Sequence, residues 1–186
     1  DIYPVGDHQT IDFDPGPAAE TMEGKFRPGH FIGMSEVVYR LLRITSPDSL
    51  FMGQKDFQQF SIIRKLITDF QMPIQLVMCP TVREANGLAM SSRNVRLSPE
   101  ARDKAGVIFN ILTSGKMLFE QKTPAKYVQD IALDALRKVN FDPEYFEVVN
   151  GYTLEPVEHM EDAEQIVACC AVKVEGVRLI DNMIWK

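Results

Sequence analysis

The chain has 186 residues, of which 45% are hydrophobic and 25% are charged, a composition typical of globular proteins. Its net charge of −6 argues against nucleic acid as a partner, and no run of eighteen apolar residues predicts a membrane helix. Its odd count of three cysteines does not indicate a disulfide scaffold. We therefore expect a cytoplasmic protein with reduced cysteines.

The first part of the chain predicts alternating helices and strands. Residues 1–30 are rich in Pro, Gly and Asp and predict mainly loop. A helix is expected after Gly33, a buried strand at 49–52, an amphipathic helix beyond Gly53, and a strand at 74–79. Helix, strand, helix and strand in this order predict a parallel α/β sheet.

The segment around Lys55 lies where the first strand gives way to a helix. Gly53 is expected to let the chain turn sharply and to let a ligand approach the backbone. Asp56 and Gln59 fit a capping box, so capping and ligand binding stay open for both residues. A cation such as Lys55 is unfavourable at a helix start unless an anion joins it, although an exposed lysine is the commoner explanation.

A second polar segment follows the next strand. After the Asn86-Gly87 turn come Ser91, Ser92 and Arg93. Two hydroxyls and a guanidinium can bind several oxygens of one polyphosphate, although a serine-rich surface turn is the alternative. A local basic set on an acidic protein suits a small anionic ligand. It consists of Lys55, Arg83, Arg93 and Arg96.

The remaining chain predicts a small α+β domain. Ser98-Pro99 and Thr123-Pro124 each predict a helix start, with Ser or Thr as the N-cap and Pro in the first turn. Strands are expected at 145–149, 165–173 and 177–183, with Gly-containing turns after the first and before the last. We place the domain boundary near Leu97, which gives domains of residues 1–97 and 98–186.

Four motifs together resemble one enzyme family. They are Glu-Gly-Lys-Phe-Arg-Pro-Gly-His-Phe-Ile-Gly at 23–33, Gly-Gln-Lys-Asp-Phe-Gln-Gln at 53–59, the loop 86–94 with Met-Ser-Ser-Arg-Asn, and Arg-Leu-Ile-Asp-Asn at 178–182. In this order they resemble the pantothenate synthetase, or pantoate-β-alanine ligase, family over essentially the whole chain. The resemblance implies a Rossmann-like parallel sheet of the nucleotidyltransferase type, followed by a small α+β domain with an antiparallel sheet.

The family carries a His-x-Gly-His signature in its N-terminal half. This sequence has three histidines, His8, His30 and His159, and none stands in that pattern. We therefore expect the chain to be the C-terminal portion of the enzyme, carrying the back half of the nucleotide-binding sheet. His30 is expected to be structural and not a general base. In the reaction that the family resemblance implies, the carboxylate of the substrate is the nucleophile, and it is already ionised, so it needs no base.

The resemblance implies an ATP-dependent ligation of pantoate and β-alanine to pantothenate, through a pantoyl adenylate and with release of AMP and pyrophosphate. Mg²⁺ would share the charge of the triphosphate, and a homodimer is implied. The family's site residues match positions of this chain: Lys55, Ser91, Ser92 and Arg93 as catalytic phosphate-binding residues, Gly53 and Asp56 at the ribose, the Val82 backbone at adenine, and Gln59 at pantoate. Gln54 stands where the family usually has Glu.

Two other functions stay open. The chain could belong to another nucleotidyltransferase of the same superfamily, or it could be a catalytically inert fragment that acts only as a folding or dimerisation unit. We expect residues 1–186 alone to bind ATP weakly if at all and to form no detectable pantothenate.

Overall fold

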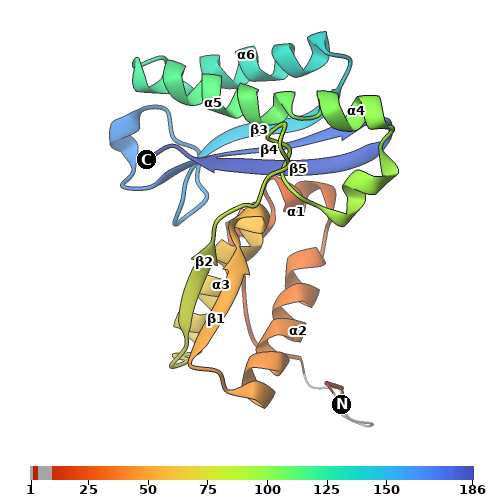
Figure 1. Ribbon diagram of the computed structural model, residues 1–186. Coiled ribbons are helices and arrows are strands. Elements are labelled where there is room, and N and C mark those ends of the chain that lie inside the picture. The colour runs from red at the N-terminus through yellow and green to blue at the C-terminus, as the bar shows by residue number, and fades with distance from the viewer. Residues whose placement is uncertain (1, 4–9) are drawn as a thin grey trace. The chain divides into compact units, whose positions relative to one another are not determined.

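A computed structural model describes residues 2–3 and 10–186 (Figure 1). The chain forms two compact units. The first consists of Asp1–Gly53 and Gln58–Cys79, and the second of Gln54–Phe57 and Pro80–Lys186. Part of the loop expected for residues 1–30, namely positions 1 and 4–9, lies outside the described residues.

The division between the units falls at Cys79 and Pro80. The loop that follows groups with the second unit because Arg83 is hydrogen-bonded to Asp181, near the end of the chain. The boundary predicted near Leu97, with domains 1–97 and 98–186, stays a prediction.

The first unit is built on a pair of parallel strands, as the order of predicted elements indicates. Ser49 lies opposite Gln75 and Gly53 lies opposite Cys79. The helices bury their apolar stripes in a small core that contains Leu42, Ile63, Leu66 and Ile67. The elements are η1 (Pro17–Ala19), α1 (Glu23–Phe26), α2 (His30–Thr45), β1 (Ser49–Gly53), α3 (Phe57–Asp69) and β2 (Gln75–Cys79), with Phe57 of α3 grouped in the second unit.

The second unit is an antiparallel sheet in the order β3-β4-β5, with helices α5 and α6 packed on it (Figure 1). The α/β class with a parallel and a separate antiparallel sheet is therefore confirmed. The elements are η2 (Gln54–Asp56), η3 (Ser92–Arg96), α4 (Pro99–Lys104), α5 (Val107–Glu120), α6 (Ala125–Lys138), β3 (Asp142–Asn150), η4 (Met160–Asp162), β4 (Ile166–Val174) and β5 (Val177–Ile184).

Local signals place most of these elements. The Ser98 hydroxyl caps α4 by accepting a hydrogen bond from the Ala101 N–H at 3.1 Å, as predicted. Glu175 and Gly176 have φ values of 49° and 75° and form the tight turn between β4 and β5. The predicted Thr123 cap is wrong, because Pro124 itself is the N-cap of α6 and makes no side-chain cap bond.

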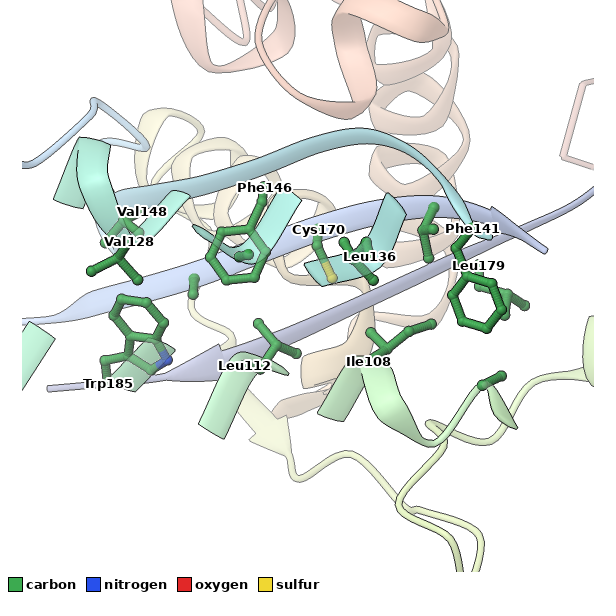
Figure 2. Packing of buried hydrophobic residues seen from close by; sticks show 14 of the residues in the cluster. Ile108, Leu112, Val128, Leu136, Phe141, Phe146, Val148, Cys170, Leu179 and Trp185 are labelled. Atoms are coloured by element: carbon green, nitrogen blue, oxygen red, sulfur yellow. The ribbon is translucent and has the colours of Figure 1, made fainter. Parts of the chain in front are cut away.

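The core of the second unit lies between the two helices and the sheet. Figure 2 shows Leu112 of α5, Leu136 of α6 and Phe146 of β3 among its buried side chains. The Trp185 ring closes one end, with its centroid 5.4 Å from that of Phe119. The packing fixes β5, the edge strand that carries the residues described below. No helix in the described part of the chain is long and apolar enough to span a membrane.

Candidate nucleotide site

Lys55 lies in η2, the 3₁₀ turn between β1 and α3. The residue is half-buried, and within the described residues its ammonium forms no ion pair. Its backbone carbonyl accepts a hydrogen bond from the Asn182 side-chain amide at 2.8 Å. The turn that presents Lys55 is thus attached to β5.

The capping box predicted for Asp56 and Gln59 is not formed. Among the described residues, neither side chain hydrogen-bonds a backbone amide at the start of α3. The reason is that Asp56 lies inside a 3₁₀ turn that runs directly into the helix, so it does not adopt the extended conformation of an N-cap. The Asp56 carboxylate is exposed and its acceptors are available.

Gly53, at the end of β1, is exposed. Its φ is not positive, and a Cβ built on it meets no atom within 4 Å, so the expectation that the turn itself needs glycine is wrong. Room for close approach by a ligand remains a reason for glycine here.

Gln58 is a buried residue of the first unit whose side chain hydrogen-bonds the backbone of residues 18–23. Its Oε1 accepts a hydrogen bond from the Glu23 N–H at 3.0 Å, and its Nε2 donates to the carbonyls of Ala18 at 2.6 Å and Thr21 at 2.9 Å. Gln58 is buried, whereas Gln59 is half-buried. Among the described residues, the Gln59 amide makes no such bond, so of this pair Gln59 is the one with an amide available to a ligand.

His30, the first residue of α2, also belongs to the first unit. Its Nδ1 lies 3.1 Å from a guanidinium nitrogen of Arg27. A ring engaged with a neighbouring cation in the turn before the helix agrees with a structural role.

The loop after β2 folds back on itself as a short hairpin. Arg83 and Ala89 form an antiparallel bridge, and the Val82 carbonyl accepts from the Met90 N–H at 2.9 Å. Val82 is 67% exposed, and within the described residues its own N–H donates no backbone hydrogen bond. The Val82 backbone N–H could therefore donate a hydrogen bond to a planar heterocycle.

Ser91, Ser92 and Arg93 lie at the end of this hairpin, where η3 begins. The Ser91 hydroxyl caps the turn by accepting from the Arg93 N–H at 3.2 Å. Ser92 and Arg93 are exposed. A hydroxyl that accepts one hydrogen bond keeps its own proton for another acceptor, such as a phosphate oxygen.

Asn94 and Glu84 hold the hairpin in shape. The Asn94 amide donates to Glu84 Oε1 at 2.7 Å and to the Ala89 carbonyl at 3.1 Å, while Arg102 donates to both Glu84 oxygens. The hydrogen bonds from Arg102 and Asn94 lower the pKa of the Glu84 carboxyl below its usual range. These hydrogen bonds hold the loop rigidly, and with it the residues at its tip.

Arg83, which the sequence grouped with the basic set, serves the fold instead. Its guanidinium donates to both oxygens of Asp181, at 2.7 and 3.0 Å, and lies 4.0 Å from the Phe109 ring centroid. Burial raises the pKa of the Asp181 carboxyl, and the hydrogen bonds from Arg83 oppose that rise. Arg83 is thus fully engaged and not free for an anion.

Three of the predicted phosphate-binding residues, Lys55, Ser91 and Arg93, come together around one small hollow in the second unit. Its volume is about 10 Å³, enough for about one water, so a triphosphate would lie at its mouth and not inside. Ser92, Asp56 and Val82 are in the same unit but do not line it, and Gly53 and Gln59 belong to the first unit. The lining residues are Lys55, Leu88, Ala89, Ser91, Arg93, Asn94, Ile108, Arg178, Leu179, Ile180 and Asp181.

The cationic side chains in and near this hollow differ in whether they bind a carboxylate. Arg83, Arg102 and Arg178 each bind a carboxylate, at 2.7–2.8 Å in their shortest contacts. Lys55 and Arg93 form no ion pair among the described residues. Two cations without an ion pair, beside the Ser91 hydroxyl whose proton can still be donated, fit an anion with several oxygens.

These donors do not resemble a metal centre. Among the described residues, no three His, Cys, Asp or Glu side chains are grouped as metal ligands. Ammonium, guanidinium and hydroxyl groups fit phosphate oxygens, and Mg²⁺ usually reaches such sites on the phosphates of its substrate.

The sequence did not assign roles to Asp181 and Asn182, although both stand in the fourth motif. The Asn182 amide donates to the carbonyls of Gln54 and Lys55, at 2.9 and 2.8 Å. Gln54 donates back to Asn182 Oδ1 at 3.2 Å, which gives this unusual residue a local role. An Asp-Asn pair between the apolar residues Leu179-Ile180 and Met183-Ile184 of one strand is the signal that could have indicated them.

Comparison with known proteins identifies the relatives of this chain. The sequence profile of the family described as pantoate-beta-alanine ligase matches residues 1–184. A pantothenate synthetase of Porphyromonas gingivalis is 40% identical over 186 residues, a match that covers 100% of this chain and 66% of the relative. One of Bacteroides fragilis is 40% identical over 189 residues, covering 100% and 65%. The chain thus spans just under two thirds of the length of these relatives.

Solved structures agree. The crystal structure of a pantothenate synthetase from Thermus thermophilus superposes with a TM-score of 0.89 at 36% identity, covering 98% of this chain and 65% of that one. A pantoate-beta-alanine ligase from Francisella tularensis, described as complexed with beta-gamma ATP and beta-alanine, has a TM-score of 0.74 at 31% identity. That match covers 100% of this chain and 61% of the other.

Proposed function

Because the chain belongs to the pantoate-β-alanine ligase family, we propose that it takes part in the ATP-dependent ligation of pantoate and β-alanine to pantothenate. The observation that carries the proposal is the meeting of Lys55, Ser91 and Arg93 at one hollow, with both cations unpaired within the described residues. The Francisella tularensis relative described with an ATP compound and β-alanine supports the same substrates.

In the first step, a carboxylate oxygen of pantoate attacks the α-phosphorus of ATP. The bond between that phosphorus and the bridging oxygen breaks, and pyrophosphate leaves with the electron pair. Lys55 and Arg93 would offset the negative charge that develops on the phosphates, and Ser91 and Ser92 would donate hydrogen bonds to them. Fixed cations and hydroxyls need little reorganisation as the charge moves.

In the second step, the amine of β-alanine attacks the carbonyl carbon of pantoyl adenylate. The carbon–oxygen bond to AMP breaks, AMP leaves with the electron pair, and the new amide nitrogen loses a proton. The adenylate is needed because a free carboxylate is a poor acyl donor. The same phosphate-binding groups would hold AMP until it leaves.

The remaining predicted residues would orient the substrates. The exposed Asp56 carboxylate can accept two ribose hydroxyls, and Gly53 leaves room for the nucleotide. The Val82 backbone would meet adenine, and the Gln59 amide would bind pantoate. Mg²⁺ would arrive on the triphosphate and share its charge.

The test compares two proteins: the 186-residue chain, and the same chain joined to the part of the Porphyromonas gingivalis relative that it does not match. Each receives Mg·ATP, pantoate and β-alanine, and AMP and pantothenate are measured. AMP formation by the joined protein that depends on pantoate supports the proposal. Nucleotidyl transfer that does not depend on pantoate favours another nucleotidyltransferase. If the joined protein is active and the 186-residue chain is not, residues 1–186 are inert by themselves. A joined protein that folds and makes no AMP contradicts the proposal.

We also propose that the protein acts as a cytoplasmic homodimer on small molecules, without nucleic acid or membrane partners. The acidic charge of −6 and the free cysteines Cys79, Cys169 and Cys170 support this setting. Sedimentation equilibrium tests the dimer, and a single species of 21.1 kDa would contradict it.

A further inference from the structure

Strand β5 carries two consecutive polar residues that are almost completely buried. Asp181 is 4% exposed and Asn182 is 2% exposed. They lie opposite Cys170 and Cys169 of β4, and successive residues of a strand point to opposite faces of its sheet. Because the two side chains lie on opposite faces, each can hold a different segment of the chain.

Asn182 holds the turn that presents Lys55. Its amide nitrogen donates to two successive carbonyls, those of Gln54 and Lys55, and its oxygen accepts from the Gln54 side chain. All three contacts join residues 127 or 128 positions apart. A buried side chain with its donors used in this way fixes the backbone from which the Lys55 side chain projects.

Asp181 holds the hairpin that presents Ser91 and Arg93. Its two oxygens bind the Arg83 guanidinium, and Oδ1 also accepts from the Asn182 N–H at 2.8 Å. Arg83 in turn donates to the Gly87 carbonyl at 3.0 Å, inside the hairpin. The bidentate pair fixes both the position and the orientation of the loop.

We infer that Asp181 and Asn182 are positioning residues that set the spacing between Lys55 and the Ser91–Arg93 tip, so that both can meet one polyphosphate. This inference rests on the proposed function. Neither residue is expected to touch the nucleotide. Their effect passes through the two segments that they hold, and a misplacement of about 1 Å in such a group can cost about 10²-fold in rate.

The test uses the joined protein described above, which carries the 186-residue chain, and its variant Asn182→Ala. Two controls match it: Gln54→Ala, which leaves both backbone carbonyls bound to Asn182, and Asn150→Ala, which removes a half-buried amide group whose oxygen caps the turn after β3. Mg·ATP binding is measured by NMR titration, and amide hydrogen exchange is measured at residues 54–57. Lys55→Ala and the double variant Lys55→Ala/Asn182→Ala complete a mutant cycle.

Asn182→Ala is expected to speed exchange at residues 54–57 and to weaken ATP binding at least about tenfold, with both controls near wild type. The double variant is expected to bind no more weakly than Lys55→Ala, since Asn182 acts through Lys55. Wild-type-like ATP affinity in Asn182→Ala, or additive losses in the double variant, would overturn the positioning role alone. A joined protein without substitutions that folds and binds no Mg·ATP would overturn the proposed function, and this role with it.

Discussion

The two compact units differ in how completely they cover their own sheets. Every residue of β4 in the second unit is buried except Lys173, whereas no residue of β1 or β2 in the first unit is fully buried. The second unit also contains Lys55, Ser91 and Arg93, although Lys55 follows a strand of the first. The comparison teaches that the proposed phosphate-binding groups belong to the unit with the larger core, while Gly53 and Gln59 belong to the other.

The largest expected effect is a loss of stability from a cavity in the core of one unit. Leu136→Ala should lower the free energy of unfolding of the second unit by about 2–5 kcal/mol, because the side chain is 1% exposed and its loss leaves a cavity. The matched change in the first unit is Leu66→Ala, at 0% exposure. Hydrogen exchange resolved by segment measures both. Equal loss of protection in β4 from the two variants would break the comparison.

Lys55→Ala tests whether the second unit holds the reactive phosphates. Adenylate formation by an active form of the protein should fall about 10²-fold or more, because one preorganised cation is lost. Stability should change little, since the ammonium forms no ion pair among the described residues. Lys65→Ala is the control, because Lys65 is a half-exposed lysine paired with Asp69 on α3. Near-normal pyrophosphate release by Lys55→Ala would remove the assignment.

The stability of the second unit should also depend on pH in the acid range. Burial by itself raises the pKa of Glu144, but the hydrogen bonds from Arg178 and Lys173 outweigh it and lower that pKa. The stabilisation is therefore present above the unfolded value of about 4.3 and is lost as the pH falls through the folded value. Glu144→Gln should cost about 1.5–3 kcal/mol at about pH 7 and less below about pH 4.

Urea denaturation from about pH 3 to about pH 7 measures this dependence. Glu120→Gln is the control, since Glu120 is half-exposed and lies 3.9 Å from Lys116. A cost of Glu144→Gln that is the same at both ends of this range would show that the ion pair does not stabilise the fold.

The smallest expected effect on stability is at Gly53. Gly53→Ala should change the free energy of unfolding by no more than about 0.5 kcal/mol, because a Cβ there meets no atom, yet it should weaken nucleotide binding. Gly106→Ala provides the contrast, since its Cβ would lie 2.2 Å from the Asn86 carbonyl oxygen. Thermal unfolding and ATP titration measure the two. Unchanged ATP binding in Gly53→Ala would mean that the nucleotide does not approach this backbone.

The sequence predicts those features whose causes are local. The spacing of Phe60, Ile63 and Leu66 predicts α3, and Ser98 predicts the start of α4. A cap at Asp56 is not formed, because a 3₁₀ turn precedes α3. The sequence could not predict this, because the residues of that turn have the same pattern as a capping box. The roles of Asp181 and Asn182 could not be predicted, because their partners are 98 and 128 positions away in the chain.

The most direct test of the account is an NMR titration of the joined protein with millimolar Mg·ATP. The account predicts that the largest amide shifts occur at Lys55, Ser91 and Arg93, in the second unit, and that they disappear in Lys55→Ala. Shifts concentrated instead at Arg43, at residues 46–48 and at residues 70–74, which line a hollow in the first unit, would contradict it.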